Sequence, residues 1–185
     1  MPRWKHSARI SEEPLSVALS SRHSIFFGVD PGTTATGYGV IRTVDNAVSY
    51  VDSGVICPRR GVPLADKLEQ IYDRLGEKLA EHAPAVVCVE QAFYGKNVRT
   101  ALVLGLARGM ALLAARKSGA EVVEYSPLEI KKAVVGNGNA AKEQVAYMVR
   151  MLLSAPQDGG RTDEYDALAA ALCAFYHHGM RLSMG

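Results

Sequence analysis

The fold is decided by a stretch near the N-terminus, Ser24-Ile25-Phe26-Phe27-Gly28-Val29-Asp30-Pro31-Gly32. Its apolar run predicts a buried strand, and the turn formers Pro31 and Gly32 mark the end of that strand. The strand ends on the carboxylate of Asp30. Because ligands in open α/β sheets bind outside the carboxyl ends of strands, Asp30 is a candidate site residue. An isolated turn or capping role is the alternative.

After this strand, two segments with a strand-like pattern are followed by one with a helical period. Thr36–Val44 and Ala47–Cys57 are two β-rich runs separated by a short turn, which predicts a meander of three strands. From Leu64 to His82 the apolar residues recur every three or four positions, as on one face of a helix. That segment is expected to cover the sheet.

The remaining elements alternate between strand and helix. We expect a strand at Ala85–Glu90, a helix at Val98–Lys117, a strand at Glu121–Ser126, a short helix from Pro127, a turn at Gly136-Asn137-Gly138, a helix from about Ala141 to Leu153 and a last helix from about Asp163 to His178. This order predicts an α/β fold with a five-stranded mixed sheet flanked by helices on both faces.

The chain length fits one globular domain. A sequence of 185 residues with 48% hydrophobic content is long enough for a full core. We assign residues 25–180 to this domain. Residues 1–24 mix Pro, Ser, Arg and Glu and are expected to form a flexible N-terminal extension, and residues 181–185 a C-terminal tail.

Composition favours a cytoplasmic protein. Cys57, Cys88 and Cys173 are odd in number and widely spaced, so neither a disulfide framework nor a zinc site is indicated. The most apolar stretch, Ala101 to Ala115, is too short and too charged for a membrane span. The formal net charge is only +2, but residues 91–150 hold nine basic and four acidic residues. Positive charge is therefore concentrated in the middle third.

Glu90 ends a second short buried strand, as Asp30 ends the first. If these strands are parallel neighbours, the two carboxylates lie close together and repel each other unless a cation lies between them. Oxygen ligands without a Cys/His cluster favour Mg²⁺ or Mn²⁺ over zinc.

Asp163 and Asp166 lie three residues apart at the start of the last helix, so their side chains share one face. A capping box at the helix start is the alternative, and in isolation it is the stronger one. Together with Asp30 and Glu90, the pair completes a set of four acids. Such a set can hold two divalent ions for phosphodiester hydrolysis.

Several separated motifs resemble the RuvC family of Holliday junction resolvases, in order and in spacing. They are Gly28-Val29-Asp30-Pro31-Gly32, Thr36-Gly37-Tyr38-Gly39, Val89-Glu90-Gln91-Ala92-Phe93 with Lys96-Asn97, Ala107-Arg108-Gly109, Lys131 to Val145, and Asp163-Glu164-Tyr165-Asp166-Ala167-Leu168-Ala169. The resemblance runs from about residue 25 to residue 178. The N-terminal 24 residues depart from the family pattern.

The resemblance implies an RNase H-like fold and a homodimer that makes two symmetric nicks in a four-way DNA junction. It assigns the metal ligands to Asp30, Glu90, Asp163 and Asp166, and some family members carry His at the position of Asp163. It implies Mg²⁺ or Mn²⁺ as cofactor, two ions per site. It also implies the branch-migration proteins RuvA and RuvB as partners.

Candidate DNA contacts surround these acids. They are Phe93, Lys96, Asn97, Arg99, Lys131 and Lys142. An aromatic residue such as Phe93 can stack on an unpaired base, or it can close the loop as a core residue. The lysines can bind phosphates. Arg99 fits a solvated helix face equally well, and roles for Tyr94, Arg108 and Lys132 stay open.

Two rival functions remain from the sequence. Asp30-Pro31-Gly32-Thr33 is similar to the phosphate loop of actin-like and hexokinase-like ATPases, although those proteins need a second lobe. The other rival is a junction-binding protein without catalytic activity. The presence of all four acids argues against it.

Overall fold

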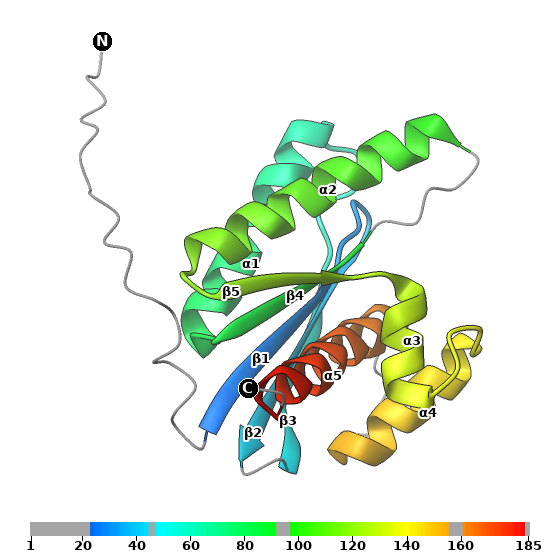
Figure 1. The fold of residues 1–185 in the computed structure, drawn as a ribbon. Helices are drawn as coiled ribbons and strands as arrows, with labels where there is room; N and C mark the ends of the chain where they lie inside the picture. Colours follow the sequence, from blue (N-terminus) through cyan, green and yellow to red (C-terminus); the bar gives the residue numbers. More distant parts are fainter. Residues whose placement is uncertain (1–22, 45–46, 92–96, 156–160, 184–185) are drawn as a thin grey trace.

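The computed structural model describes residues 23–44, 47–91, 97–155 and 161–183. A five-stranded mixed sheet forms its centre, with strand order β3-β2-β1-β4-β5 (Figure 1). The strands are β1 (His23–Asp30), β2 (Thr36–Val44), β3 (Ala47–Ile56), β4 (Val86–Glu90) and β5 (Glu121–Tyr125). The first three strands pair antiparallel, whereas β4 pairs parallel with both β1 and β5. The predicted mixed sheet is confirmed.

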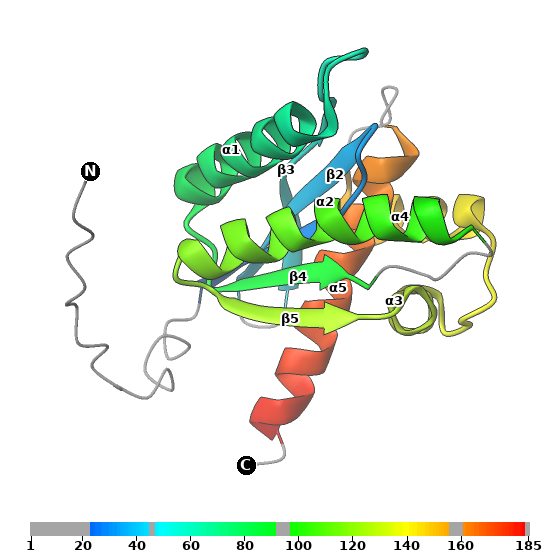
Figure 2. The same ribbon diagram turned by 90° about the horizontal axis from the view of Figure 1, so that it is seen from above.

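Helices cover both faces of the sheet (Figure 2). On one face lie α1 (Leu64–His82) and α2 (Val98–Lys117), and on the other lie α3 (Pro127–Val135), α4 (Lys142–Leu153) and α5 (Thr162–Ser183). Alternation along β1 divides the core between them, because Phe27 packs with the first layer and Phe26 with the second. Each face of the sheet therefore has its own apolar cluster.

Most predicted element boundaries agree with the structure to within one or two residues. The last helix is the exception, because it continues past His178 to Ser183. Gly179 follows His178 directly, but one glycine inside a helix costs only about 1 kcal/mol and does not end it. Residues 181–183, expected in the tail, thus belong to α5. Residues 1–22 of the N-terminal extension lie outside the described residues, and its flexibility stays a prediction.

Glycines in β1 and β2 allow α5 to approach the sheet closely. A Cβ atom added to Gly28 would clash with the carbonyl oxygen of Ala167, and one added to Gly37 would clash with that of Asp163. Gly39 pairs with Gly28 across the two strands and is crowded by α5 in the same way. The glycine-rich motif around Asp30 therefore serves helix–sheet packing.

Helix α2 is less buried than its composition suggests. Its buried residues are all alanines: Ala107, Ala111, Ala114 and Ala115. Within the described residues it is the one helix long and apolar enough to cross a membrane by length and composition, which is weak evidence on its own. The stretch expected to be too short for a span is thus part of a helix of 20 residues. That helix packs on the sheet beside α1.

Candidate active site

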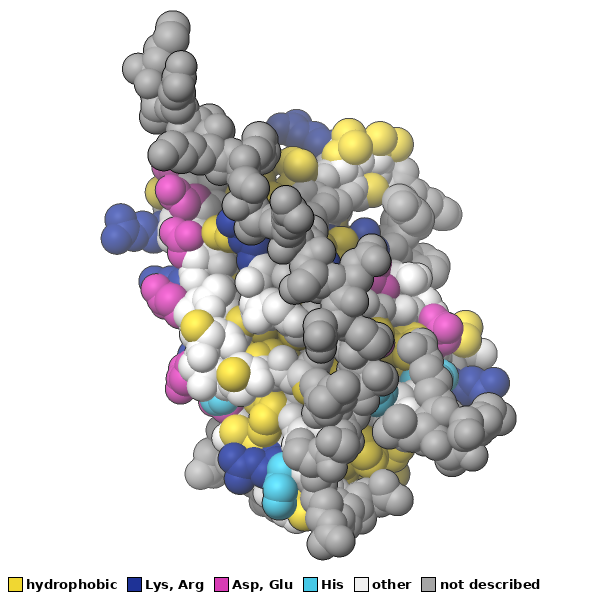
Figure 3. Space-filling model, turned by 60° about the vertical axis from the view of Figure 1, so that its left-hand side comes forward, with side chains coloured by type: hydrophobic (Ala, Val, Ile, Leu, Met, Phe, Trp, Pro, Cys, Tyr) yellow, Lys and Arg dark blue, Asp and Glu magenta, His cyan; other side chains and the backbone are white. Residues whose placement is uncertain are grey.

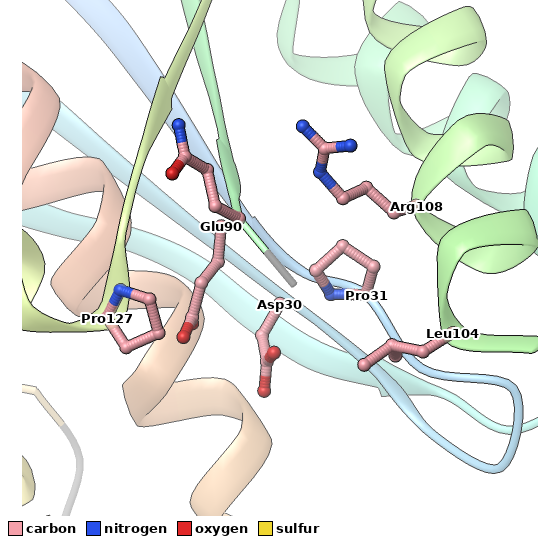
Figure 4. Close-up of a pocket in the computed structure, with 7 residues that line it drawn as sticks. Asp30, Pro31, Glu90, Leu104, Arg108 and Pro127 are labelled. Atoms are coloured by element: carbon pink, nitrogen blue, oxygen red, sulfur yellow. The ribbon is translucent and has the colours of Figure 1, made fainter. Parts of the chain in front are cut away.

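Asp30 and Glu90 lie side by side at the ends of two parallel strands. The register pairs Val29 with Val89, so the next residue of each strand is the carboxylate. Both side chains are half-buried and point the same way from the sheet (Figure 4). The parallel pairing of β1 and β4 therefore produces the predicted proximity of the two strand-end carboxylates.

The surroundings of these carboxylates oppose their ionisation. Burial, followed by the negative charge of Asp166, raises the pKa of Asp30 from 3.8 to about 7. Burial and the charges of Asp30 and Asp166 raise the pKa of Glu90 from 4.5 to about 8. The nearby Lys142 ammonium lowers both pKa values but does not cancel these effects. Two ionised carboxylates here require additional positive charge.

The start of α5 brings Asp163 and Asp166 to the same end of the sheet. Asp166 Oδ2 accepts a hydrogen bond of 2.7 Å from Lys142 Nζ. Asp163 is half-buried, and its charge contributes to the raised pKa of Asp30. Its backbone contacts Gly37, the residue paired with Asp30 across β1 and β2. The four acids predicted from the sequence therefore come from three elements that meet at one place.

The capping alternative for this helix is resolved in favour of a different residue. Glu164 Oε1 accepts a hydrogen bond of 3.2 Å from the backbone N–H of Arg161, and Glu164 N–H donates to the Arg161 carbonyl at 3.0 Å. The first of these bonds is one half of a capping box, and the second is a backbone bond of the helix start. Asp166 is therefore free to face Lys142 and the strand ends.

A cavity of about 240 Å³ joins these groups. It is lined by Asp30, Glu90, Asp166, Lys131 and Lys142, together with apolar residues of α3, α4 and α5. Carboxylate oxygens are the ligands that Mg²⁺ and Mn²⁺ prefer, and two of these half-buried carboxylates lie beside each other. The donor set therefore fits a hard divalent cation.

A tighter group of acidic ligands lies elsewhere. Among the described residues, Asp52, Glu81 and His82 are the three whose ligand atoms all lie within 4.8 Å of one another. Lys78 Nζ already contacts Asp52 at 3.3 Å and Glu81 at 2.9 Å, so this group has a cation of its own. It joins α1 to β3. Three of the four predicted acids, Asp30, Glu90 and Asp166, by contrast line an open cavity, and Asp163 is not among the residues that line it.

The predicted DNA contacts divide into three groups. Lys131 and Lys142 line the cavity, and Lys131 Nζ also donates to the Ala140 carbonyl at 2.8 Å. Asn97 caps α2, because its side chain accepts a bond of 3.2 Å from Thr100 N–H. Arg99 is exposed in the first turn of α2. The predicted contacts Phe93 and Lys96 lie outside the described residues.

Charge is mixed on the face of the molecule that Figure 3 shows. On the face shown in Figure 3, basic and acidic side chains lie interspersed along one edge of the molecule. The small net charge of +2 agrees with this. Positive charge at the strand ends therefore comes from individual lysines that line the cavity.

Sequence reasoning left one residue of the site unassigned. Arg108 of α2 lines a second cavity, of about 190 Å³, that also borders Asp30 and Glu90. Its guanidinium forms an ion pair with Glu124 of β5. The signal in the sequence was a single charged residue inside an apolar helical stretch, which predicts neither the partner nor the cavity.

Comparison with known proteins gives one consistent family. The model of the family "Crossover junction endodeoxyribonuclease RuvC" matches residues 26–174. The RuvC protein of Pelotomaculum thermopropionicum is 45% identical over 83% of this chain and 94% of its own length. That of Syntrophotalea carbinolica is 49% identical over 79% of this chain and 90% of its own length.

A solved structure agrees with these relatives. Thermus thermophilus RuvC, determined in complex with a Holliday junction substrate, superposes with a TM-score of 0.79 at 32% identity, covering 85% of this chain and 96% of that one. The five-stranded sheet and its helices match this RNase H-like structure. The chain belongs to the RuvC family of crossover junction endodeoxyribonucleases.

Proposed function

We propose that this protein is a structure-selective endonuclease that resolves Holliday junctions in recombination and DNA repair by paired symmetric nicks. One observation of this chain carries the proposal. Asp30 and Glu90, held beside each other by a parallel strand pair, border a cavity with Asp166 and two lysines. Family membership supplies the substrate class, and the geometry supplies groups suited to hydrolysing a phosphodiester.

The four acids would hold the cofactor, Mg²⁺ or Mn²⁺, with two ions per site. When bound, such ions lower the pKa of an attacking water and stabilise the leaving oxygen of the phosphodiester. The raised pKa values of Asp30 and Glu90 support this role, because a divalent charge between them would restore their ionised form. Asp163 and Asp166 would complete the set from α5.

Lysines and the loop after β4 would hold the DNA. Lys142 and Lys131 line the cavity and would contact phosphates near the bond that is cut. Arg99, at the exposed start of α2, would add a phosphate contact further along the strand. Phe93 would stack on a base opened at the junction, with Lys96 and Asn97 beside it.

A homodimer would place two such sites on one junction. Two equivalent cuts in a two-fold symmetric substrate call for two equivalent sites. The exposed leucines and valine of α2 offer a surface for this contact, because they fall on one side of the helix: Val98 at 73% exposure, Leu102 at 67%, Leu106 at 46% and Leu113 at 45%. We place the dimer contact there. RuvA and RuvB would be its partners in branch migration. The protein would act in the cytoplasm.

The catalytic proposal is tested by Asp30→Asn and Glu90→Gln. Each change keeps the side-chain shape but removes a charge that holds cations, and we expect nicking of a four-way junction in Mg²⁺ to fall roughly 10³-fold or more. Junction binding in a gel-shift assay should stay within a few-fold of wild type. Asp52→Asn, in the other acidic group, is the matched control and should cut normally.

The rival functions predict different results in the same experiment. A non-catalytic junction-binding protein would bind the labelled junction and leave it intact with every metal. An ATPase would turn over ATP without DNA. Near wild-type nicking by Asp30→Asn or Glu90→Gln would show that the assignment of the site is wrong.

A further inference from the structure

The cavity around Arg108 is built differently from the one that the lysines line. Pro31, Leu104 and Pro127 form apolar walls, and the polar groups of the lining beyond the two acids are Gln91 and Arg108. Figure 4 shows the carboxylates of Asp30 and Glu90 pointing the same way, while Arg108 reaches in from α2 on their other side. The strand ends thus border two cavities.

The charge of Arg108 is already matched. Its Nη2 forms an ion pair with Glu124, a residue of β5 that lies opposite Val89 in the register of β4 and β5. The side chain is only 27% exposed. Its Nε is buried and finds no hydrogen-bond partner among the described residues. A buried donor beside the cavity is therefore left unmatched, and a small shift of the Arg108 side chain would present it to an acceptor that enters.

The pairing of Arg108 with Glu124 determines which part of a DNA strand fits this cavity. Arg108 is the one cation among the described residues that line this cavity, and its charge is already paired with Glu124, so the cavity offers a phosphate no free positive charge. An uncharged nucleobase needs none. Its planar faces can contact proline and leucine, and its edge offers acceptors to an arginine.

Gln91 provides the second polar group for such an edge. Its backbone N–H donates to the Tyr125 carbonyl at 3.0 Å, which fixes the residue beside β5 directly after the strand end of Glu90. Its side chain is exposed and lines the cavity. An amide offers both a donor and an acceptor, so together with Arg108 Nε it can distinguish one base edge from another.

We propose that this cavity receives one unpaired base next to the phosphodiester being cut, and that Arg108 and Gln91 determine which base is accepted. The inference rests on the proposed function, because the opened junction supplies the unpaired base. It makes both residues determinants of cleavage sequence. They would act on the rate at which a given junction is cut and leave its binding through phosphates unchanged.

The test uses the full chain and four-way junctions that differ only in the bases at the branch point. Single-turnover nicking rates in Mg²⁺ are measured for wild type, Arg108→Lys and Gln91→Ala. We expect the ratio of rates between the best and the worst junction to fall roughly tenfold in Arg108→Lys, because lysine keeps the charge but loses the Nε donor. Arg116→Lys, exposed near the end of the same helix, is the matched control and should keep the ratio.

Two further measurements separate this role from others. The slope of log binding constant against log salt should be unchanged in Arg108→Gln, which removes the charge, whereas loss of a phosphate contact would reduce it by about one. An abasic nucleotide beside the scissile phosphate should slow wild type more than Arg108→Lys.

Unchanged rate ratios in both variants would overturn the inference, as would an equal loss of rate on all junctions. A wild type that cuts every junction equally would overturn it too. A wild type that cuts no four-way junction would instead refute the proposed function. Gln91→Ala changes an exposed side chain, so the test stands even if Arg108→Lys does not fold.

Discussion

Helices α5 and α2 are both long and apolar, yet they meet the sheet in different ways. The segment of α5 from Ala167 to Ala174 is buried at every position. Helix α2 buries four alanines and exposes leucines on its other side. The difference comes from their partners, because glycines of β1 and β2 make room for the backbone of α5, while α2 packs against α1 and the sheet through its alanines.

This contrast connects packing to the site. The close approach of α5 carries Asp163 and Asp166 to the strand end of Asp30, so the glycine motif positions two of the proposed metal ligands. Helix α2 instead contributes Arg108 from its buried side and an apolar surface from its exposed side. One helix is buried against the sheet, and the other keeps an exposed apolar side.

The largest effect is expected where α5 contacts the sheet. Gly28→Ala places a Cβ atom against the carbonyl oxygen of Ala167, so α5 has to move away. We expect the free energy of unfolding to fall by roughly 3–5 kcal/mol, measured by denaturant titration. A variant as stable as wild type would show that the close approach is not required.

The exposed side of α2 should control association. Replacing Leu102 and Leu106 together by Glu puts two charges on the proposed contact, and we expect the dimer dissociation constant to rise about 100-fold, or about 3 kcal/mol. Sedimentation at several concentrations measures it. Met151→Glu, at a position of α4 that is 63% exposed, is the matched control. An unchanged dimer in the double variant would place the contact elsewhere.

The site beside α5 should make stability depend on pH. The pKa values of Asp30 and Glu90 are raised to about 7 and about 8 in the folded protein, so it binds more protons than the unfolded chain. Without divalent cations, stability should therefore fall as the pH rises from about 4 through about 8, by roughly 2 kcal/mol. Thermal unfolding in EDTA measures this fall.

Two comparisons check the origin of that pH dependence. Glu90→Gln removes one of the two groups, so its curve should be flatter and the variant should be more stable than wild type near pH 8.5. Asp52→Asn should keep the wild-type slope. Addition of Mg²⁺ should raise wild-type stability at high pH. A wild-type curve that rises over this range would contradict the assigned protonation.

The smallest effect is expected at a glycine that has free space around it, in contrast to Gly28. Gly76 lies inside α1, and a Cβ atom added there meets nothing within 4 Å. Gly76→Ala should therefore increase the free energy of unfolding by about 0.5–1 kcal/mol, because alanine restricts the unfolded chain and favours helix. Denaturant titration of this variant and of Gly28→Ala would show that the surroundings of the glycine, and not the residue type, determine the sign of the change in the free energy of unfolding.

Much of the fold and part of the site could be predicted from local pattern. Alternation and helical period located all five strands and all five helices found in the described residues, because these periods state which side chains share a face. The positions of Asp30 and Glu90 at strand ends followed from the same pattern. Local pattern alone did not indicate the family. The order and spacing of several separated motifs did.

Residue pattern and motif spacing were thus enough to predict the elements, their order, and four acids as candidates for one site. The packing of the elements was needed to bring Asp166 to Lys142. The same packing pairs Arg108 with Glu124 and leaves an apolar side of α2 exposed. Local propensity depends on neighbours within a turn or two, whereas these contacts join residues far apart in the chain. They form only when the helices are packed on the sheet, at distances set by glycines and alanines.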